Sequence, residues 1–145
     1  MPFSYPKKEK LKSQKGIEQL FSEGKSVSAY PLRMVYLKSE FDDNTKFKTG
    51  VTVSKRNFKN AVDRNRIKRL LREAYRLNKA MYFNNISSCY TLMILYIGKD
   101  GTDFDSIDKK MKQLLEAFSK KVVEIISNYK NYSDNVIIPL SSERV

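Results

Sequence analysis

Basic side chains are concentrated between residues 54 and 79, where the chain reads SKRNFKNAVDRNRIKRLLREAYRLNK. Ten Lys and Arg residues and two acidic residues give this stretch a net charge of +8, out of +12 for all 145 residues. Exposed helix faces usually mix the two signs, so concentrated like charge favours a polyanionic partner over a merely solvated surface. Arg and Lys on a rigid helix can contact several phosphates at once. The candidate nucleic-acid-binding residues are Lys55, Arg56, Lys59, Arg64, Asn65, Arg66, Lys68, Arg69, Arg72 and Arg76.

Apolar residues from about residue 60 onward recur at spacings of three and four, which predicts an amphipathic helix. Asn65 falls within its cationic face, where a neutral amide suggests a specific hydrogen bond to a partner. A bond to the protein's own backbone at the start of the helix is an equal alternative. The predicted apolar face is Ile67, Leu70, Leu71, Ala74, Leu77 and Met81, and the predicted cationic face is Lys68, Arg69, Arg72, Arg76 and Lys79.

The chain contains no histidine, which excludes Ser-His-Asp and Cys-His arrangements, a His general base and His-containing zinc sites. Carboxylates with a hard metal remain possible. Four aspartates cluster in KDGTDFDSIDKK, but their spacing is not that of a calcium loop. Capping of a helix N-terminus is therefore favoured over a self-sufficient metal nuclease for Asp100, Asp103, Asp105 and Asp108.

The composition indicates one domain with a real core, because 41% of the residues are hydrophobic and 17 are Phe or Tyr. The longest apolar run, Tyr90 to Ile97, is far shorter than the roughly 20 residues that span a bilayer, so no membrane association is expected. No secretory signal is visible at the N-terminus. A single cysteine, Cys89, fits a reducing cytoplasm, where we expect the protein to act.

The order of expected elements predicts an α+β fold, a two-layer sandwich of helices against a small, mainly antiparallel sheet. A helix beginning near Ser13 precedes strands at 30–37 and 47–54, with a short strand near 26–28. The basic helix, a strand at 90–97 and a helix from Asp105 or Ser106 follow. We expect a mobile basic arm at 1–10, the domain at 11–128, and a C-terminal tail at 129–145 that is loose or adds an edge strand.

The segment AVDRNRIKRLLREA, at 61–74, resembles the signature of the bacterial ribonuclease P protein subunit, an Arg-Asn-Arg motif followed by Lys-Arg on a helix. The preceding GVTVSKR also matches this family, as do Leu11-Lys12, Phe21 and Gly24, whereas Ile17 replaces an aromatic residue. The resemblance covers about residues 11–128 in element order and size.

The resemblance implies a protein cofactor of a ribozyme that removes the 5′ leader of precursor tRNA. The RNA subunit would hydrolyse the phosphodiester with its own Mg²⁺, so the protein would bind no cofactor and supply no catalytic residue. The Arg-Asn-Arg helix would contact the catalytic RNA, and a separate cleft would hold the single-stranded leader with Ile17, Phe21 and Tyr36.

The resemblance also implies a left-handed βαβ crossover, the two-layer fold shared with a domain of a small-subunit ribosomal protein, and a monomer within the ribonucleoprotein. The alternative is a generic structured-RNA-binding or ribosome-associated protein without a role in tRNA cleavage.

Overall fold

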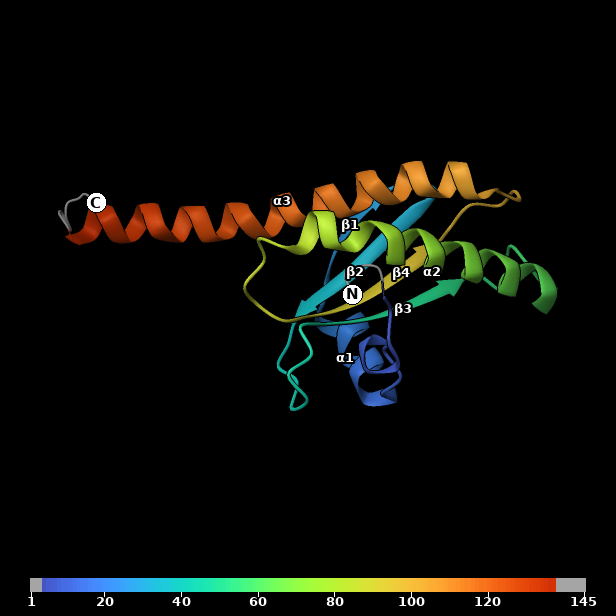
Figure 1. The fold of residues 1–145 in the computed structure, drawn as a ribbon, viewed down its shortest axis with the longest axis horizontal. Helices are drawn as coiled ribbons and strands as arrows, with labels where there is room; N and C mark the ends of the chain where they lie inside the picture. The colour runs from blue at the N-terminus through green and yellow to red at the C-terminus, as the bar shows by residue number, and fades with distance from the viewer. Residues whose placement is uncertain (1–3, 138–145) are drawn as a thin grey trace.

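The structure, a computed structural model, describes residues 4–137, and the surroundings of side chains for residues 4–122. Three α-helices and four strands follow one another in the order expected from the sequence, after a 3₁₀ turn that was not expected (Figure 1). Their bounds are η1 Lys7–Glu9, α1 Gln14–Glu23, β1 Lys25–Ala29, β2 Leu32–Lys38, β3 Phe47–Val53, α2 Ala61–Phe83, β4 Tyr90–Tyr96 and α3 Phe104–Ile137.

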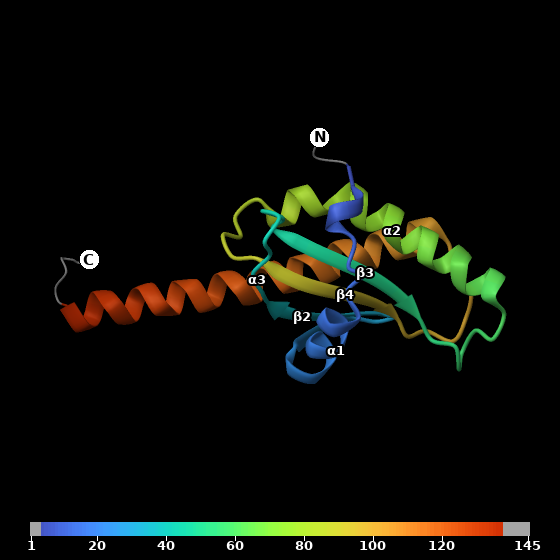
Figure 2. The ribbon, with the colours of Figure 1, turned by 90° about the horizontal axis from the view of Figure 1, so that it is seen from below.

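The four strands form one sheet in the order β1-β2-β4-β3. Strands β1 and β2 and strands β2 and β4 pair antiparallel, whereas β3 and β4 pair parallel. Figure 2 views the sheet from the α1 side. In this view β3 and β4 run in the same direction, with β4 below β3, and the connecting helix α2 passes behind the sheet. This is a left-handed crossover. The mainly antiparallel sheet and the α-β-β-β-α-β-α order are therefore confirmed.

The sheet separates two apolar clusters of different size. Helices α2 and α3 lie together on one face and enclose the larger core, while α1 covers part of the other face (Figures 1 and 2). Beneath α1, Leu20, Val35 and Met93 form the smaller cluster. Because side chains alternate along a strand, the central strands β2 and β4 contribute to both clusters.

Local hydrogen bonds set the start of each helix. The Ser13 hydroxyl accepts from the Gly16 N–H at 3.1 Å at the start of α1, and the Asn60 side chain accepts from the Val62 N–H at 2.8 Å at the start of α2. Asp103 Oδ1 accepts from the Ser106 N–H at 2.9 Å, so α3 begins slightly earlier than expected. These side chains satisfy N–H groups that the first helical turn leaves without partners.

Gly24 ends α1 because of a close approach rather than an unusual backbone angle. Its φ is −74°, which any residue can adopt. A Cβ atom there would lie 2.4 Å from the Leu20 carbonyl oxygen and 2.9 Å from Val35 Cγ1. Glycine therefore allows α1 to turn directly into β1 while lying against β2.

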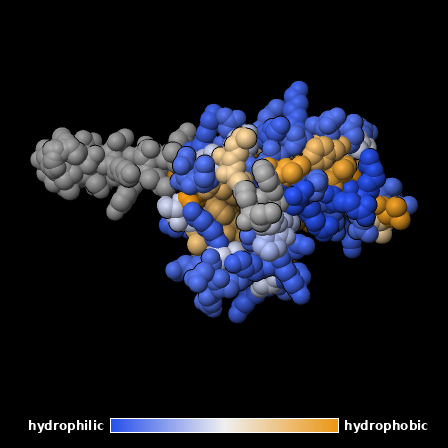
Figure 3. Space-filling model, viewed as in Figure 1, coloured by the Kyte–Doolittle hydropathy of each residue, from blue (hydrophilic) through white to orange (hydrophobic). Residues whose placement is uncertain are grey.

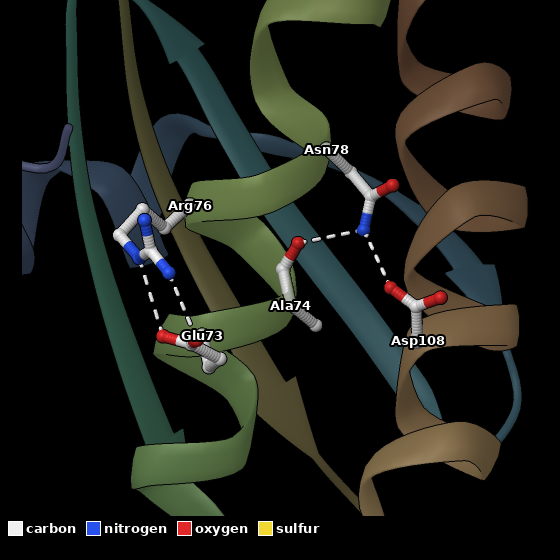
Figure 4. A network of polar contacts seen from close by, with 5 residues as sticks. All are labelled: Glu73, Ala74, Arg76, Asn78 and Asp108. Atoms are coloured by element: carbon white, nitrogen blue, oxygen red, sulfur yellow. Dashed lines mark hydrogen bonds and ion pairs between the residues drawn. The ribbon is translucent and has the colours of Figure 1, made fainter. Parts of the chain in front are cut away.

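A polar contact joins α2 to α3 within the helical layer (Figure 4). The side-chain amide of Asn78 donates to the Ala74 carbonyl at 2.7 Å and to Asp108 Oδ1 at 2.7 Å. Asn78 is only 6% exposed, so both bonds are made where water cannot easily replace them. This contact sets the position of α2 along α3.

The N-terminal segment is not the expected mobile arm, at least for residues 4–10. The Tyr5 ring packs edge-on against Tyr75 with centroids 5.4 Å apart, and its hydroxyl donates to the Thr49 carbonyl. Lys10 forms a parallel bridge with Thr49 on β3. Strand β3 is an edge strand with unpaired backbone groups, and this segment covers part of that edge.

The C-terminal segment also differs from the expectation of a loose tail or edge strand. Helix α3 continues through residues 129–137, since the first proline after its start is Pro139 and no glycine interrupts it from 104 onward. The rest of that expected tail, 138–145, lies outside the described residues.

Candidate nucleic-acid interface

Two arginines of the Arg-Asn-Arg motif hold neighbouring loops against the start of α2. The Arg64 guanidinium donates to the Phe58 carbonyl at 2.8 Å and to the Lys59 carbonyl at 2.9 Å. The Arg66 guanidinium donates to the Thr102 carbonyl, in the loop before α3, at 2.9 Å. Each guanidinium carries five N–H donors, so both keep donors for a further partner. Arg64 and Arg66 therefore serve the fold as well as any bound RNA.

Asn65 lies on the exposed surface of α2. Within the described residues its side chain makes no hydrogen bond to the protein, and Asn60 rather than Asn65 caps the helix. Of the two roles considered for Asn65, the bond to its own backbone is therefore not the one that forms. The amide remains available to a ligand.

The cationic face of α2 consists of side chains that share the outward side of the helix with Asn65. Arg69 and Arg72 are exposed and Lys68 is half-buried. Arg76 pairs with Glu73 at 2.8 Å (Figure 4), and this hydrogen bond holds the pKa of the Glu73 carboxyl below its usual range. Figure 3 shows hydrophilic side chains over much of the molecular face on which α2 lies. The members of the cationic face are Asn65, Lys68, Arg69, Arg72 and Arg76.

Lys79 was expected on this face but is committed to the N-terminal segment. Its ammonium pairs with Glu9 and lies 5.7 Å from the Tyr5 ring centroid. Because that segment packs on α2, the buried side of the helix differs from the expected apolar face. It includes Tyr75, which is 1% exposed, but not Met81, which is 70% exposed. The expected apolar face is thus correct for the first half of α2 and wrong for Leu77 and Met81.

A hollow of about 460 Å³ lies on the sheet face beside α1. Ile17 and Phe21 of α1 line it together with Gly50 of β3, where an added Cβ atom would lie 3.1 Å from Met93 Cε. Phe21 is 49% exposed, which is unusual for an aromatic ring beside a sheet. We call this hollow the sheet-face groove; its lining residues are Tyr5, Lys10, Leu11, Lys12, Ile17, Phe21, Thr49, Gly50, Val51, Thr52, Arg72 and Met93.

Arg72 joins the cationic face to the sheet-face groove, because its side chain belongs to both. Its charge also acts on Tyr5 at the edge of the groove. Burial raises the pKa of Tyr5 to about 12, and nearby Arg72 opposes that rise. Tyr5 is therefore neutral at physiological pH and can keep donating its hydroxyl proton to the Thr49 carbonyl.

The family model described as Ribonuclease P matches residues 5–119, which is most of the chain. The chain belongs to the ribonuclease P protein family. The ribonuclease P protein component of Porphyromonas gingivalis is 34% identical over 116 residues, covering 78% of this chain and 85% of that protein. The corresponding protein of Dictyoglomus thermophilum is 35% identical over 114 residues, covering 78% and 87%.

Solved structures of this family share the fold. The ribonuclease P protein of Staphylococcus aureus superposes with a TM-score of 0.61 at 21% identity, covering 79% of this chain and 96% of that one. The protein from Thermotoga maritima gives 0.61 at 24% identity, covering 75% and 96%.

Tyr36 does not join the groove that the ribonuclease P resemblance implied for it. The side chain is 7% exposed and lies on the opposite face of the sheet, edge-on to Phe118 with ring centroids 5.1 Å apart. Burial raises its pKa. Neighbouring Val35 faces α1 instead, since adjacent side chains of β2 alternate between faces. Assigning Tyr36 to the leader cleft was therefore wrong, whereas Ile17 and Phe21 do line one groove.

A second basic hollow lies where the parallel strands β3 and β4 end. Arg56 and Lys99 line it, and the Asn57 side chain donates to the Gly98 carbonyl at 3.2 Å across it. Arg56 was expected among the nucleic-acid-binding residues, whereas Lys99 was not. A signal for Lys99 was present in the sequence, because this residue comes three positions after the end of the buried strand β4 and parallel strands end at the same edge of a sheet. Lys55 and Lys59 are exposed in the same loop region.

Two of the four aspartates near the start of α3 are engaged by the protein itself. Asp103 caps the helix, and the bond from the Ser106 N–H lowers its pKa. Asp108 binds Asn78 and pairs with Lys112 at 3.1 Å. Capping is thereby confirmed as the role of Asp103. Among residues 4–122, no three His, Cys, Asp or Glu side chains are grouped so as to hold a metal ion.

No helix in the described part of the chain combines the length and the apolar character needed to cross a bilayer.

Proposed function

We propose that this chain is the RNA-binding protein subunit of ribonuclease P and assists a catalytic RNA in removing the 5′ leader of precursor tRNA. The observation that carries this proposal is the junction at Arg72, where a cationic helix face meets an apolar groove with a half-exposed aromatic ring. A cationic face suits the phosphates of a folded RNA, and an aromatic-lined groove suits an unpaired strand.

The two surfaces have separate tasks in this proposal. The cationic face, with Asn65 at its N-terminal end, binds the catalytic RNA through phosphate contacts and a specific hydrogen bond. The sheet-face groove holds the single-stranded leader, with a base stacked on Phe21 and the aliphatic Ile17 providing an apolar contact beside it. Arg72 lies where the leader leaves the catalytic RNA.

Bond cleavage is assigned to the RNA subunit and its Mg²⁺ in this proposal, and no side chain of this protein is catalytic. The engagement of Asp103 in a helix cap and of Asp108 with Asn78 and Lys112 supports this assignment. We further propose that one copy of the chain acts per ribonucleoprotein, in the cytoplasm, where its single cysteine would remain reduced.

Reconstitution tests the proposed function directly. Adding the purified chain to its cognate RNA subunit is expected to raise the rate of precursor tRNA cleavage at low Mg²⁺, because protein cations replace part of the charge screening that the metal otherwise supplies. Cleavage is followed by release of the labelled leader. Tight RNA binding without any stimulation would instead indicate the alternative, a structured-RNA-binding protein without a role in tRNA cleavage.

Replacement of Phe21 by alanine is expected to weaken binding of precursor tRNA by about five- to a hundredfold, the loss typical of one base–aromatic stack. Affinity for tRNA without a leader and for the catalytic RNA is expected to stay the same. Tyr36→Phe is the matched control, since Tyr36 lies on the far face of the sheet. Equal losses with and without a leader would show that Phe21 does not contact the leader.

A further inference from the structure

A third hollow, distinct from the basic hollow lined by Arg56 and Lys99, lies on the sheet face beside α1. It is on the other side of Phe21 from the sheet-face groove. It measures about 210 Å³ and lies over strands β1, β2 and β4. Phe21 lines both this hollow and the sheet-face groove, so the two meet at one aromatic ring. The lining residues of this third hollow are Phe21, Gly24, Ser26, Arg33, Val35 and Leu95.

The strand register places both hollows on one row that crosses the sheet. Arg33 on β2 pairs with Leu95 on β4, and Leu95 pairs with Thr52 on β3. Neighbouring strands lie about 4.8 Å apart, so the row from Thr52 to Arg33 spans roughly 10 Å. That length corresponds to about three stacked nucleotides at ~3.4 Å each. An unpaired strand in the sheet-face groove can therefore reach Arg33.

Arg33 has donors available for such a strand. The side chain is exposed, and its guanidinium donates to the Ser26 hydroxyl at 3.4 Å. Among the described residues it forms no ion pair with a carboxylate. A guanidinium with only one long hydrogen bond retains the fork of donors that suits a phosphate.

Charge and aromatic character alternate along this path. Lys10, Lys12 and Arg72 lie at the β3 end, Phe21 lies where the hollows meet, and Arg33 lies at the far end. Cations separated by a stacking ring are the pattern that binds single-stranded nucleic acid without strict sequence preference. An acidic or purely apolar partner would not use both features.

We propose that Arg33 binds a backbone phosphate of the single-stranded RNA leader, on the side of Phe21 away from α2. This rests on the proposed function, in which α2 contacts the catalytic RNA and the leader enters the groove from the β3 side. Arg33 then contacts a nucleotide further from the cleavage site than the base on Phe21. It extends the length of leader that the protein can recognise.

A series of precursor tRNAs whose leaders grow by one nucleotide at a time tests this inference in the reconstituted holoenzyme. Arg33→Ala is expected to match the wild type on short leaders and to lose about three- to tenfold in affinity once the leader reaches Arg33. The slope of log affinity against log salt should fall by about one over the same lengths. Arg33→Lys should retain most of the affinity.

Lys38→Ala is the matched control, because it removes the same charge from the other end of β2, beside a different hollow. It is expected to follow the wild type at every length. If wild-type affinity rises with leader length and the Arg33→Ala variant has the wild-type affinity at every length, the role of Arg33 is overturned. Binding of the leader in the groove would still stand. A loss that is equal at all lengths would place Arg33 against another part of the complex and also overturn the inference. If the affinity of the wild-type holoenzyme does not depend on leader length, the proposed leader groove itself is contradicted.

Discussion

Replacing Lys68, Arg69 and Arg72 together by alanine is expected to weaken binding of the catalytic RNA by about a hundredfold. The three side chains lie on the cationic face, and each lost phosphate contact removes a charge-assisted hydrogen bond and the release of counterions that accompanies it. The slope of log affinity against log salt should therefore fall by about three. A filter-binding titration at several salt concentrations measures both quantities.

This triple variant is preferable to one that removes the arginines of the Arg-Asn-Arg motif. Arg64 holds the loop before α2 through the carbonyls of Phe58 and Lys59, and Arg66 holds the loop before α3 through the Thr102 carbonyl. Their loss would therefore disturb the fold as well as the interface.

The control removes three cations from α3, as Lys109→Ala, Lys112→Ala and Lys120→Ala, for the same loss of net charge. If both triple variants bind equally weakly, net charge alone determines affinity and the cationic face of α2 has no special role.

Replacing Phe118 by alanine is expected to lower the free energy of unfolding by about 3–5 kcal/mol. Phe118 is 0% exposed and contacts Tyr36, Phe83 and Tyr90 edge-on, with ring centroids 5.1–5.7 Å apart. Truncation leaves a cavity between the sheet and the helical layer that these rings can fill only partly. Chemical denaturation measures the loss, which is a large share of the roughly 5–15 kcal/mol typical of a domain.

Two further variants make the stability result interpretable. Phe118→Leu keeps most of the volume and is expected to cost less than about half as much as Phe118→Ala, so it reports on packing if the alanine variant does not fold. Phe21→Ala removes the same kind of side chain from an exposed position and should cost under about 1 kcal/mol. A Phe118→Ala variant as stable as the Phe21→Ala variant would contradict the core described above.

The groove could be predicted in part from the sequence. Phe21 and Ile17 follow from helical spacing together with the family motif, and both line the groove. Tyr36 was misplaced by one position, because a strand with apolar residues on both faces does not reveal which face is which. Only the packing of α1 on Val35 and of Phe118 on Tyr36 resolves this ambiguity.

The ends of the chain were predicted least well. The segment at residues 4–10 looks like a charged arm in sequence, but Tyr5 packs against Tyr75 and Glu9 pairs with Lys79. These partners lie about seventy positions away along the chain, and no local pattern relates them. The same contacts take Lys79 out of the cationic face, which helical spacing alone could not indicate.

The sequence by itself determined the family, the order of elements and the cationic character of α2, because these depend on residue type and short-range spacing. The tertiary structure decided which cations also serve the fold, since Arg66 and Lys79 bind groups brought in from elsewhere in the chain and Lys79 is thereby taken out of the cationic face. It also decided that Phe21 and Arg33 share one path across the sheet. That juxtaposition depends on strand register and on the side of the sheet that α1 covers, and both are set by packing between distant residues.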